Sequence, residues 1–144
     1  MAFNILIVDD SPAMRKVVRR VVEISGVQVG KYLEAGNGVQ ALSILRSEWV
    51  DLVMTDINMP DMNGEELLIE VRHDNSLADI PVLVVSTDRS ETRIRQMIAA
   101  GASGYISKPF VPAALSEEIH RLLGGPSNDT NDIDDTNDII YDRL

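Results

Sequence analysis

Charged residues follow three short apolar runs of this sequence. Asp9 and Asp10 follow one run, Asp56 follows a second, and Lys108 follows a third. Short apolar runs bounded by turn residues are typical of buried parallel strands. Ligands bind outside the carboxyl ends of such strands, so these side chains are predicted to meet at one rim of a sheet. Three carboxylates and one ammonium at that rim would suit a divalent cation and a phosphoryl group.

The apolar runs alternate with segments of helical periodicity along the whole chain. This alternation predicts βα repeats and a parallel sheet, and hence the α/β fold class. Five such units fit the length of the sequence, which gives a (βα)5 chain. The strands are expected at residues 5–9, 29–34, 52–56, 82–86 and 104–106.

Each expected helix is marked by apolar residues at helical spacing and by a start or stop signal. The first helix is expected to begin after Ser11-Pro12, with proline in the first turn. The third is expected to open after Gly64, and the fourth to close at Gly101. The marking residues, in chain order, are Met14, Val17, Val18, Val21 and Val22; Val39, Leu42 and Leu45; Leu67, Leu68 and Val71; Ile94, Met97 and Ile98; Leu115, Ile119, Leu122 and Leu123.

Composition limits the possible classes of protein. The 144 residues are enough for one domain with a single core. The net charge of −10 argues against a nucleic-acid partner, because such proteins usually present a basic face. No apolar stretch suits a membrane span and the start of the chain lacks a secretory signal, so we expect a cytoplasmic location without membrane insertion. The absence of cysteine excludes disulfides and thiolate metal sites.

The last part of the chain differs from the rest. Residues 126–144 contain six Asp and one Arg, in near-repeats of Asn-Asp-Thr and Asn-Asp-Ile. Low hydrophobicity with charge of one sign predicts an acidic, disordered tail. Residues 1–125 are then expected to form the folded domain, without a second output domain.

The order and context of the charged residues resemble the receiver domain of two-component response regulators. The matching motifs are Asp9-Asp10, Asp56 followed by Met-Pro-Asp-Met-Asn-Gly at 59–64, Ser86, and Lys108-Pro109-Phe110. The resemblance covers about residues 3–123, and the wider context is most similar to single-domain chemotaxis regulators of the CheY type. It implies a flavodoxin-like, doubly wound sheet of five parallel strands in the order 2-1-3-4-5.

The resemblance also implies a role for each residue near the phosphorylation site. Asp56 would accept a phosphoryl group from a sensor histidine kinase (CheA-like) or from a phosphotransfer protein, with Mg²⁺ as the cofactor. Asp10 and Asp56 would bind the metal directly, Asn58 through its backbone carbonyl, and Asp9 through water. The protein would then be a signalling switch with slow self-catalysed phosphorylation and dephosphorylation, and not an enzyme.

The switch implied by the resemblance uses three further residues. Lys108 would hold the phosphoryl oxygens, and its bond to Pro109 is expected to be cis. Ser86 would hydrogen-bond the phosphoryl group and draw the following loop inward, and Tyr105 would change rotamer as that loop moves. The output face would be formed by the fourth helix, the fifth strand and the fifth helix, where an effector protein binds. Alternation along a strand does not distinguish the hydroxyl of Ser86 from that of Thr87, and only the motif register favours Ser86.

Two positions near the expected site depart from the common family pattern. Thr87 is bulkier than the small residue usual after the switch hydroxyl, which would narrow access for phosphodonors or a phosphatase. Asp88 and Asn58 would flank the path of a hydrolytic water. This pair resembles receivers with a short-lived acyl phosphate, although Asp88 is shorter than the Glu of similar proteins.

Three alternatives remain open from the sequence. The first is a phosphorelay shuttle or phosphate sink that binds no motor or other effector. The second is a Mg²⁺-dependent phosphatase of the haloacid dehalogenase type, whose Asp-x-Asp pattern is broken here by Asp9-Asp10-Ser11. The third is a flavodoxin, whose phosphate loop would not carry two carboxylates.

Overall fold

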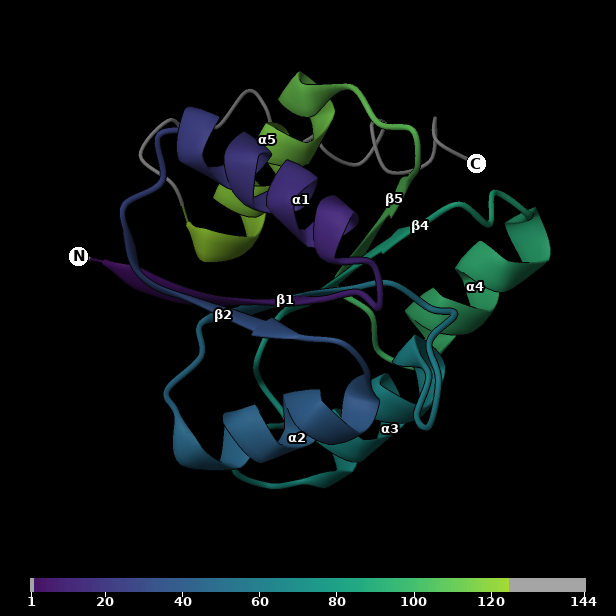
Figure 1. Cartoon of the computed structure of the whole chain (residues 1–144). Coiled ribbons are helices and arrows are strands. Elements are labelled where there is room, and N and C mark those ends of the chain that lie inside the picture. The colour runs from purple at the N-terminus through teal and green to yellow at the C-terminus, as the bar shows by residue number, and fades with distance from the viewer. Residues whose placement is uncertain (1, 125–144) are drawn as a thin grey trace.

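A parallel sheet of five strands lies between two layers of helices in the computed structural model, which describes residues 2–124 (Figure 1). The strand order is β2-β1-β3-β4-β5, and every neighbouring pair is parallel. This confirms the flavodoxin-like α/β fold. In chain order the elements are β1 (Phe3–Val8), α1 (Pro12–Ile24), β2 (Val29–Ala35), α2 (Gly38–Ser47), β3 (Leu52–Thr55), α3 (Gly64–His73), β4 (Val82–Ser86), α4 (Glu91–Ala99), β5 (Gly104–Ser107) and α5 (Pro112–Leu123).

Two cores lie on the two faces of the sheet, because successive side chains of a strand point to opposite sides. Leu6 and Val8 of β1 pack in the core beneath α2, α3 and α4. Ile5 and Ile7 pack in the core beneath α1 and α5. Since helices cover both faces, the inner strands are mainly apolar, which is why they appear in the sequence as nearly continuous apolar runs.

Side-chain caps begin four of the helices at the rim where the strands end. The oxygen of Ser11 accepts the N–H of Met14 at the start of α1, and Asn37 and Ser90 play the same part for α2 and α4. At α3, Asn63 and Glu66 form a reciprocal capping box. Each cap satisfies a backbone donor that the first helical turn leaves unpaired, so the loops at this rim are held in defined positions.

Three apolar residues that mark helices in the sequence lie outside the buried core. Val17, Val39 and Ile98 fall at helical spacing in the sequence, but these residues are about half exposed. They lie at the flank of each apolar stripe, and helical spacing does not show how much of that stripe the sheet covers. The strands β1 and β3 also end one residue earlier than expected, so Asp9 and Asp56 stand in the loops that follow.

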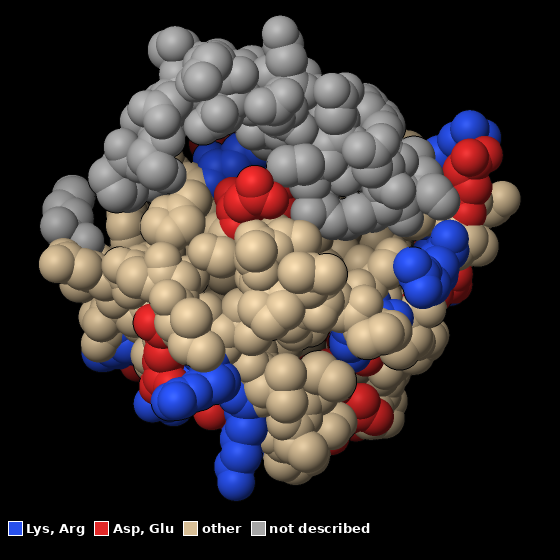
Figure 2. Space-filling model, turned by 90° about the horizontal axis from the view of Figure 1, so that it is seen from above, with Lys and Arg blue, Asp and Glu red and all other residues tan. Residues whose placement is uncertain are grey.

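The surface over α1 and α5 carries acidic and basic side chains close together (Figure 2). On α1, Arg19 and Arg20 both pair with Glu23, and the Arg19 guanidinium also stacks on the ring of Tyr32. These pairs offset part of the positive charge of this helix.

No helix among residues 2–124 has the length and apolar character that a membrane crossing requires. The expected acidic tail at 126–144, and the domain limit at 125, lie outside the described residues.

Candidate functional site

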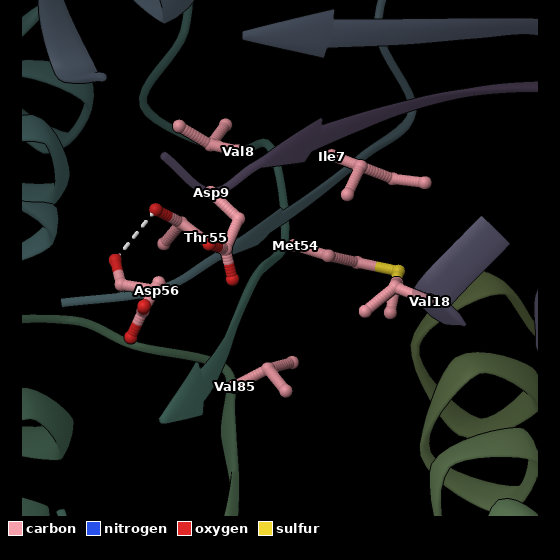
Figure 3. Close-up of a pocket in the computed structure, with 8 residues that line it drawn as sticks. All are labelled: Ile7, Val8, Asp9, Val18, Met54, Thr55, Asp56 and Val85. Carbon is pink, nitrogen blue, oxygen red and sulfur yellow. Dashed lines mark hydrogen bonds between the residues drawn. The ribbon is translucent and has the colours of Figure 1, made fainter. Parts of the chain in front are cut away.

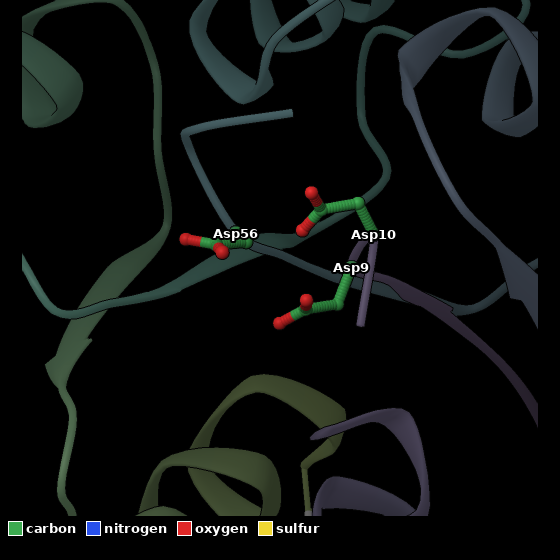
Figure 4. A group of neighbouring side chains, drawn as sticks. All are labelled: Asp9, Asp10 and Asp56. Atoms are coloured by element: carbon green, nitrogen blue, oxygen red, sulfur yellow. The ribbon is translucent and has the colours of Figure 1, made fainter. Parts of the chain in front are cut away.

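The three predicted carboxylates meet at the carboxyl ends of two adjacent strands. Val8 of β1 pairs with Thr55 of β3, so Asp9 and Asp56 leave the sheet side by side. Carboxylate oxygens of Asp9, Asp10 and Asp56 lie within 4.8 Å of one another (Figure 4). A cluster of hard oxygen ligands of this kind suits Mg²⁺.

The two carboxylates after β1 have different surroundings. Asp9 is buried, and its Oδ1 accepts the backbone N–H of Ser11 at 2.9 Å. Its backbone carbonyl accepts a hydrogen bond from Arg15 Nη1 at 2.6 Å. Asp10 is exposed to solvent. Asp9 is therefore held in place by its neighbours, whereas Asp10 is open toward incoming ligands.

Lys108 brings the expected positive charge to this cluster from the end of β5. Its Nζ donates to Asp9 Oδ2 at 3.1 Å and to Asp56 Oδ2 at 3.4 Å, and the residue is only 7% exposed. The Lys108–Pro109 peptide bond is cis, as expected. One ammonium against three carboxylates leaves an excess of negative charge, which a divalent cation would balance.

Asp56 sits partly buried at the floor of the site. Burial raises the pKa of its carboxyl group, the N–H of Ile57 and the charge of Lys108 act in the opposite direction, and the charge of Asp9 adds to the rise. Ile57 N–H donates to Asp56 Oδ1 at 2.7 Å, which leaves Oδ2 turned toward Lys108. The hydroxyl of Thr55 donates to the backbone carbonyl of Asp56 at 2.8 Å (Figure 3).

A narrow pocket continues from Asp9 and Asp56 into the core. Its apolar walls include Val18, Met54 and Val85 (Figure 3). The apolar lining contributes to the burial of Asp56, because low polarity disfavours the ionised carboxylate.

Replacing Asp56 with Asn is expected to stabilise the metal-free fold at neutral pH. A carboxyl group whose pKa is raised on folding stabilises the protein below its unfolded pKa, near the ordinary value of 3.8, and loses that contribution as the pH rises through the folded pKa. The variant should therefore melt above the wild type in EDTA, by about 4 °C for each kcal/mol. The gap should widen from acidic to neutral pH. A variant that melts below the wild type at neutral pH would contradict this account.

The two candidate switch hydroxyls have different environments. Ser86 is fully buried, and its Oγ accepts the N–H of Asp88 at 3.1 Å. Thr87 is exposed. Val84 of β4 lies in the core with Tyr105, so alternation places Ser86 on that same face of the sheet. This geometry favours Ser86 as the switch hydroxyl.

Tyr105 is buried completely, and its hydroxyl donates to the backbone carbonyl of Asp88. Burial raises the pKa of this phenol, while the nearby hydroxyl of Ser86 acts in the opposite direction. The side chain thus ties the loop after β4 to β5. If that loop moves, either the hydrogen bond between Tyr105 and Asp88 breaks or the Tyr105 ring moves with the loop.

The two residues expected beside a hydrolytic water also lie at the rim. Asn58 is exposed. Asp88 Oδ1 accepts the N–H of Ser90 at 2.9 Å, a bond that lowers the pKa of Asp88, and its Oδ2 lies 3.6 Å from Arg93 Nε. Both oxygens of the Asp88 carboxylate therefore already have partners, one in its own loop and one on α4.

Gly64 and Arg93 also help to build the site, although the sequence marked Gly64 only as the start of a helix. A Cβ on Gly64 would lie 2.1 Å from the backbone oxygen of Asp56, so only glycine allows α3 to start this close to the site. Arg93 Nη1 donates to Glu65 Oε1 at 3.1 Å and joins α4 to α3. A glycine before a helical pattern can be recognised in a sequence. The ion pair of Arg93 and Glu65 joins residues 28 positions apart, so no local sequence pattern indicates it.

Comparisons with known proteins agree with this site. The family model described as "Response regulator receiver domain" matches residues 5–120. The chain is 36% identical to a "Chemotaxis protein CheY homolog" of Campylobacter jejuni over 127 residues, which covers 88% of this chain and 96% of the relative. It is also 36% identical to "Chemotaxis protein CheY1" of Helicobacter pylori over 122 residues, covering 84% of this chain and 97% of the relative.

A solved structure supports the same assignment. The chemotaxis response regulator CheY4 of Vibrio cholerae superposes with a TM-score of 0.76 at 30% identity, covering 85% of this chain and 100% of that one. These matches do not favour the phosphatase or the shuttle alternative. Members of this family act as signalling switches and not as classical enzymes. The chain belongs to the response regulator receiver domain family, as a CheY-like, chemotaxis-type member of two-component phosphorelay signalling.

Proposed function

We propose that Asp56 is the phosphoacceptor of this receiver. Its Oδ2 lies beside Lys108 Nζ, at the point where β1 and β3 bring the carboxylates together. An oxygen of Asp56 attacks phosphorus, and the bond from phosphorus to the donor breaks. The product is an acyl phosphate. Lys108 offsets charge on the transferred oxygens.

The same cluster is the proposed Mg²⁺ site. When bound, Mg²⁺ would neutralise the repulsion between a carboxylate and an approaching phosphoryl anion. Asp10 and Asp56 would ligate directly, Asn58 through its backbone carbonyl, and Asp9 through water. The exposure of Asp10 and the engagement of Asp9 with Lys108 support this division.

The proposed signal passes from Ser86 to the face formed by α4, β5 and α5. Ser86 donates its hydroxyl to a phosphoryl oxygen, and the loop after β4 follows. Since Tyr105 is bonded to the carbonyl of Asp88 in that loop, its ring moves with the loop. In its changed conformation, the face formed by α4, β5 and α5 binds a downstream effector protein.

The phosphodonor is proposed to be a sensor histidine kinase of the CheA-like class or a phosphotransfer protein. Chemotaxis is the proposed pathway, supported by the names of the relatives in Campylobacter jejuni and Helicobacter pylori. Thr87 would narrow access for donors and for a phosphatase partner. Self-catalysed phosphorylation and dephosphorylation are proposed to be slow, and the location cytoplasmic.

The observation that carries this proposal is the approach of Lys108 Nζ to both Asp9 and Asp56. Incubation of the full chain with acetyl phosphate tests it directly. We expect the mass to increase by one phosphoryl group with Mg²⁺ and to stay unchanged with EDTA. A chain that gains no phosphoryl group under either condition, and accepts none from a histidine kinase, would refute the proposal.

Replacing Ser86 with Ala is expected to uncouple phosphorylation from the switch. The variant keeps Asp56, so it should still accept phosphate, while the NMR shift changes at Tyr105 and on the α4–β5–α5 face on adding beryllofluoride become small. Lys108→Ala should behave similarly. Thr87→Val is the matched control, because its hydroxyl lies on the exposed side. Wild-type shifts in Ser86→Ala together with lost shifts in Thr87→Val would assign the switch to Thr87.

Removal of residues 126–144 is expected to leave the receiver functional. We propose the folded domain as residues 1–125, because the site and the described core lie within residues 2–124. Mg²⁺ affinity and Asp56 labelling should change less than about twofold. The truncated chain should be compared with the full chain by thermal shift and by acetyl phosphate labelling. If the truncated chain fails to fold, residues 126–144 are required for the folded structure, and the proposed domain limit is wrong.

A further inference from the structure

Two buried hydroxyls lie side by side where β4 and β5 end. Ser86 pairs with Ser107 in the parallel register of these strands, and Val84 pairs with Tyr105 two residues earlier along them. Val84 and Tyr105 both point into the core beneath α2, α3 and α4. Because side chains alternate, Ser86 and Ser107 also point to that side, at the level of the phosphorylation site.

The hydroxyl of Ser107 has no hydrogen-bond partner among the described residues, although the residue is only 7% exposed. Leaving a buried hydroxyl unpaired destabilises a fold, so such a group calls for a reason. Ser86 has a partner, the N–H of Asp88 at 3.1 Å. The unpaired member of the two hydroxyls is thus the one that directly precedes Lys108.

We propose that Ser107 is a positioning residue for the phosphoryl group and acts through Ser86, an inference that rests on the proposed function. A serine hydroxyl has one proton to donate and two lone pairs to accept. When Ser86 turns its proton to a phosphoryl oxygen on Asp56, the Ser107 hydroxyl donates to the Ser86 oxygen. With this bond accepted, the proton of Ser86 points to the phosphoryl oxygen. The two hydrogen bonds, from Ser107 to Ser86 and from Ser86 to the phosphoryl group, strengthen each other in the buried interior.

This arrangement biases the switch between two states. The Ser107 hydroxyl is unpaired in the unphosphorylated structure and paired in the phosphorylated one. A group that is better satisfied in one of two states shifts the equilibrium toward that state. Ser107 would therefore slightly destabilise the unphosphorylated state and increase the affinity of the site for a phosphoryl group.

The test compares Ser107→Ala with the wild type in the full chain. In EDTA the variant should melt higher, because it removes an unpaired buried hydroxyl. With Mg²⁺, its affinity for beryllofluoride should fall about three- to tenfold, the size expected for one lost hydrogen bond. Ser107→Thr retains a hydroxyl and should bind beryllofluoride within about twofold of the wild type.

Ser103→Ala is the matched control. The Ser103 hydroxyl oxygen accepts the N–H of Val82 at 3.0 Å, at the opposite end of β5 from the site. Its loss should lower the melting temperature and leave beryllofluoride affinity unchanged. Unchanged affinity in Ser107→Ala, or equal losses in Ser107→Ala and Ser107→Thr, would overturn the role of Ser107. A wild-type chain that fails to bind beryllofluoride would overturn the proposed function, and this inference with it.

Discussion

Replacement of Asp56 by Asn should abolish acid-stable, hydroxylamine-labile labelling of the protein by acetyl phosphate or by a kinase. An amide is not a nucleophile toward phosphorus and forms no acyl phosphate, although it has nearly the same shape as the carboxylate. The expected loss is complete, whereas the fold should persist because the amide keeps an oxygen for the N–H of Ile57. Labelling of intact protein followed by mass spectrometry measures the effect.

Asp61→Asn is the matched control for this experiment. Asp61 lies in the same loop after β3, but its carboxylate accepts a hydrogen bond from Asn37 at 3.3 Å and does not belong to the cluster of three carboxylates. It should label like the wild type. Persistent labelling of Asp56→Asn would place the phosphoacceptor elsewhere, and loss of labelling in Asp61→Asn would show that the loop as a whole is required.

Asp9→Ala and Asp10→Ala should differ in their effects on the metal-free fold. Asp9 is buried and paired with Lys108 at 3.1 Å, so its removal leaves a buried ammonium with Asp56 as its remaining partner. We expect the free energy of unfolding in EDTA to fall by about 1–3 kcal/mol. Asp10 is exposed within the same negative cluster, so its removal relieves repulsion and should be neutral or stabilising.

The same two variants should differ again when Mg²⁺ is added. The rise in melting temperature caused by metal should be lost in Asp10→Ala, which lacks a direct ligand, and only reduced in Asp9→Ala. Urea unfolding in EDTA and thermal melts across a Mg²⁺ titration measure the two effects separately. Equal metal responses in the two variants would refute the proposed division between direct and water-mediated ligands.

Most of the fold was predictable because its signals are local. The strands are buried on both faces, so they appear as apolar runs, and the turns after them carry the polar residues. Gly64 marks the start of α3 in the sequence, and the helix begins at this residue in the structure. The exposure of Val39 and Ile98 was not predictable, since it depends on how far the sheet extends beneath each helix.

The sequence by itself determined which side chains reach the rim. Asp9, Asp10, Asp56 and Lys108 each follow an apolar run, and the carboxyl ends of parallel strands lie on the same edge of the sheet. The motif context also identified the family, which the comparisons confirmed. Both results depend on short motifs, and the residues within each motif are neighbours in the chain.

Only the tertiary structure decided which of these groups touch. The strand order places β4 between β5 and β3, so Lys108 must reach past β4 to contact Asp56, and Asp9 beyond it. Asp9 and Lys108 are 99 residues apart, and no local pattern encodes their pairing. The unpaired hydroxyl of Ser107 likewise follows from the register of β4 and β5. Contacts between strands depend on register and packing across the whole sheet, which local sequence does not specify.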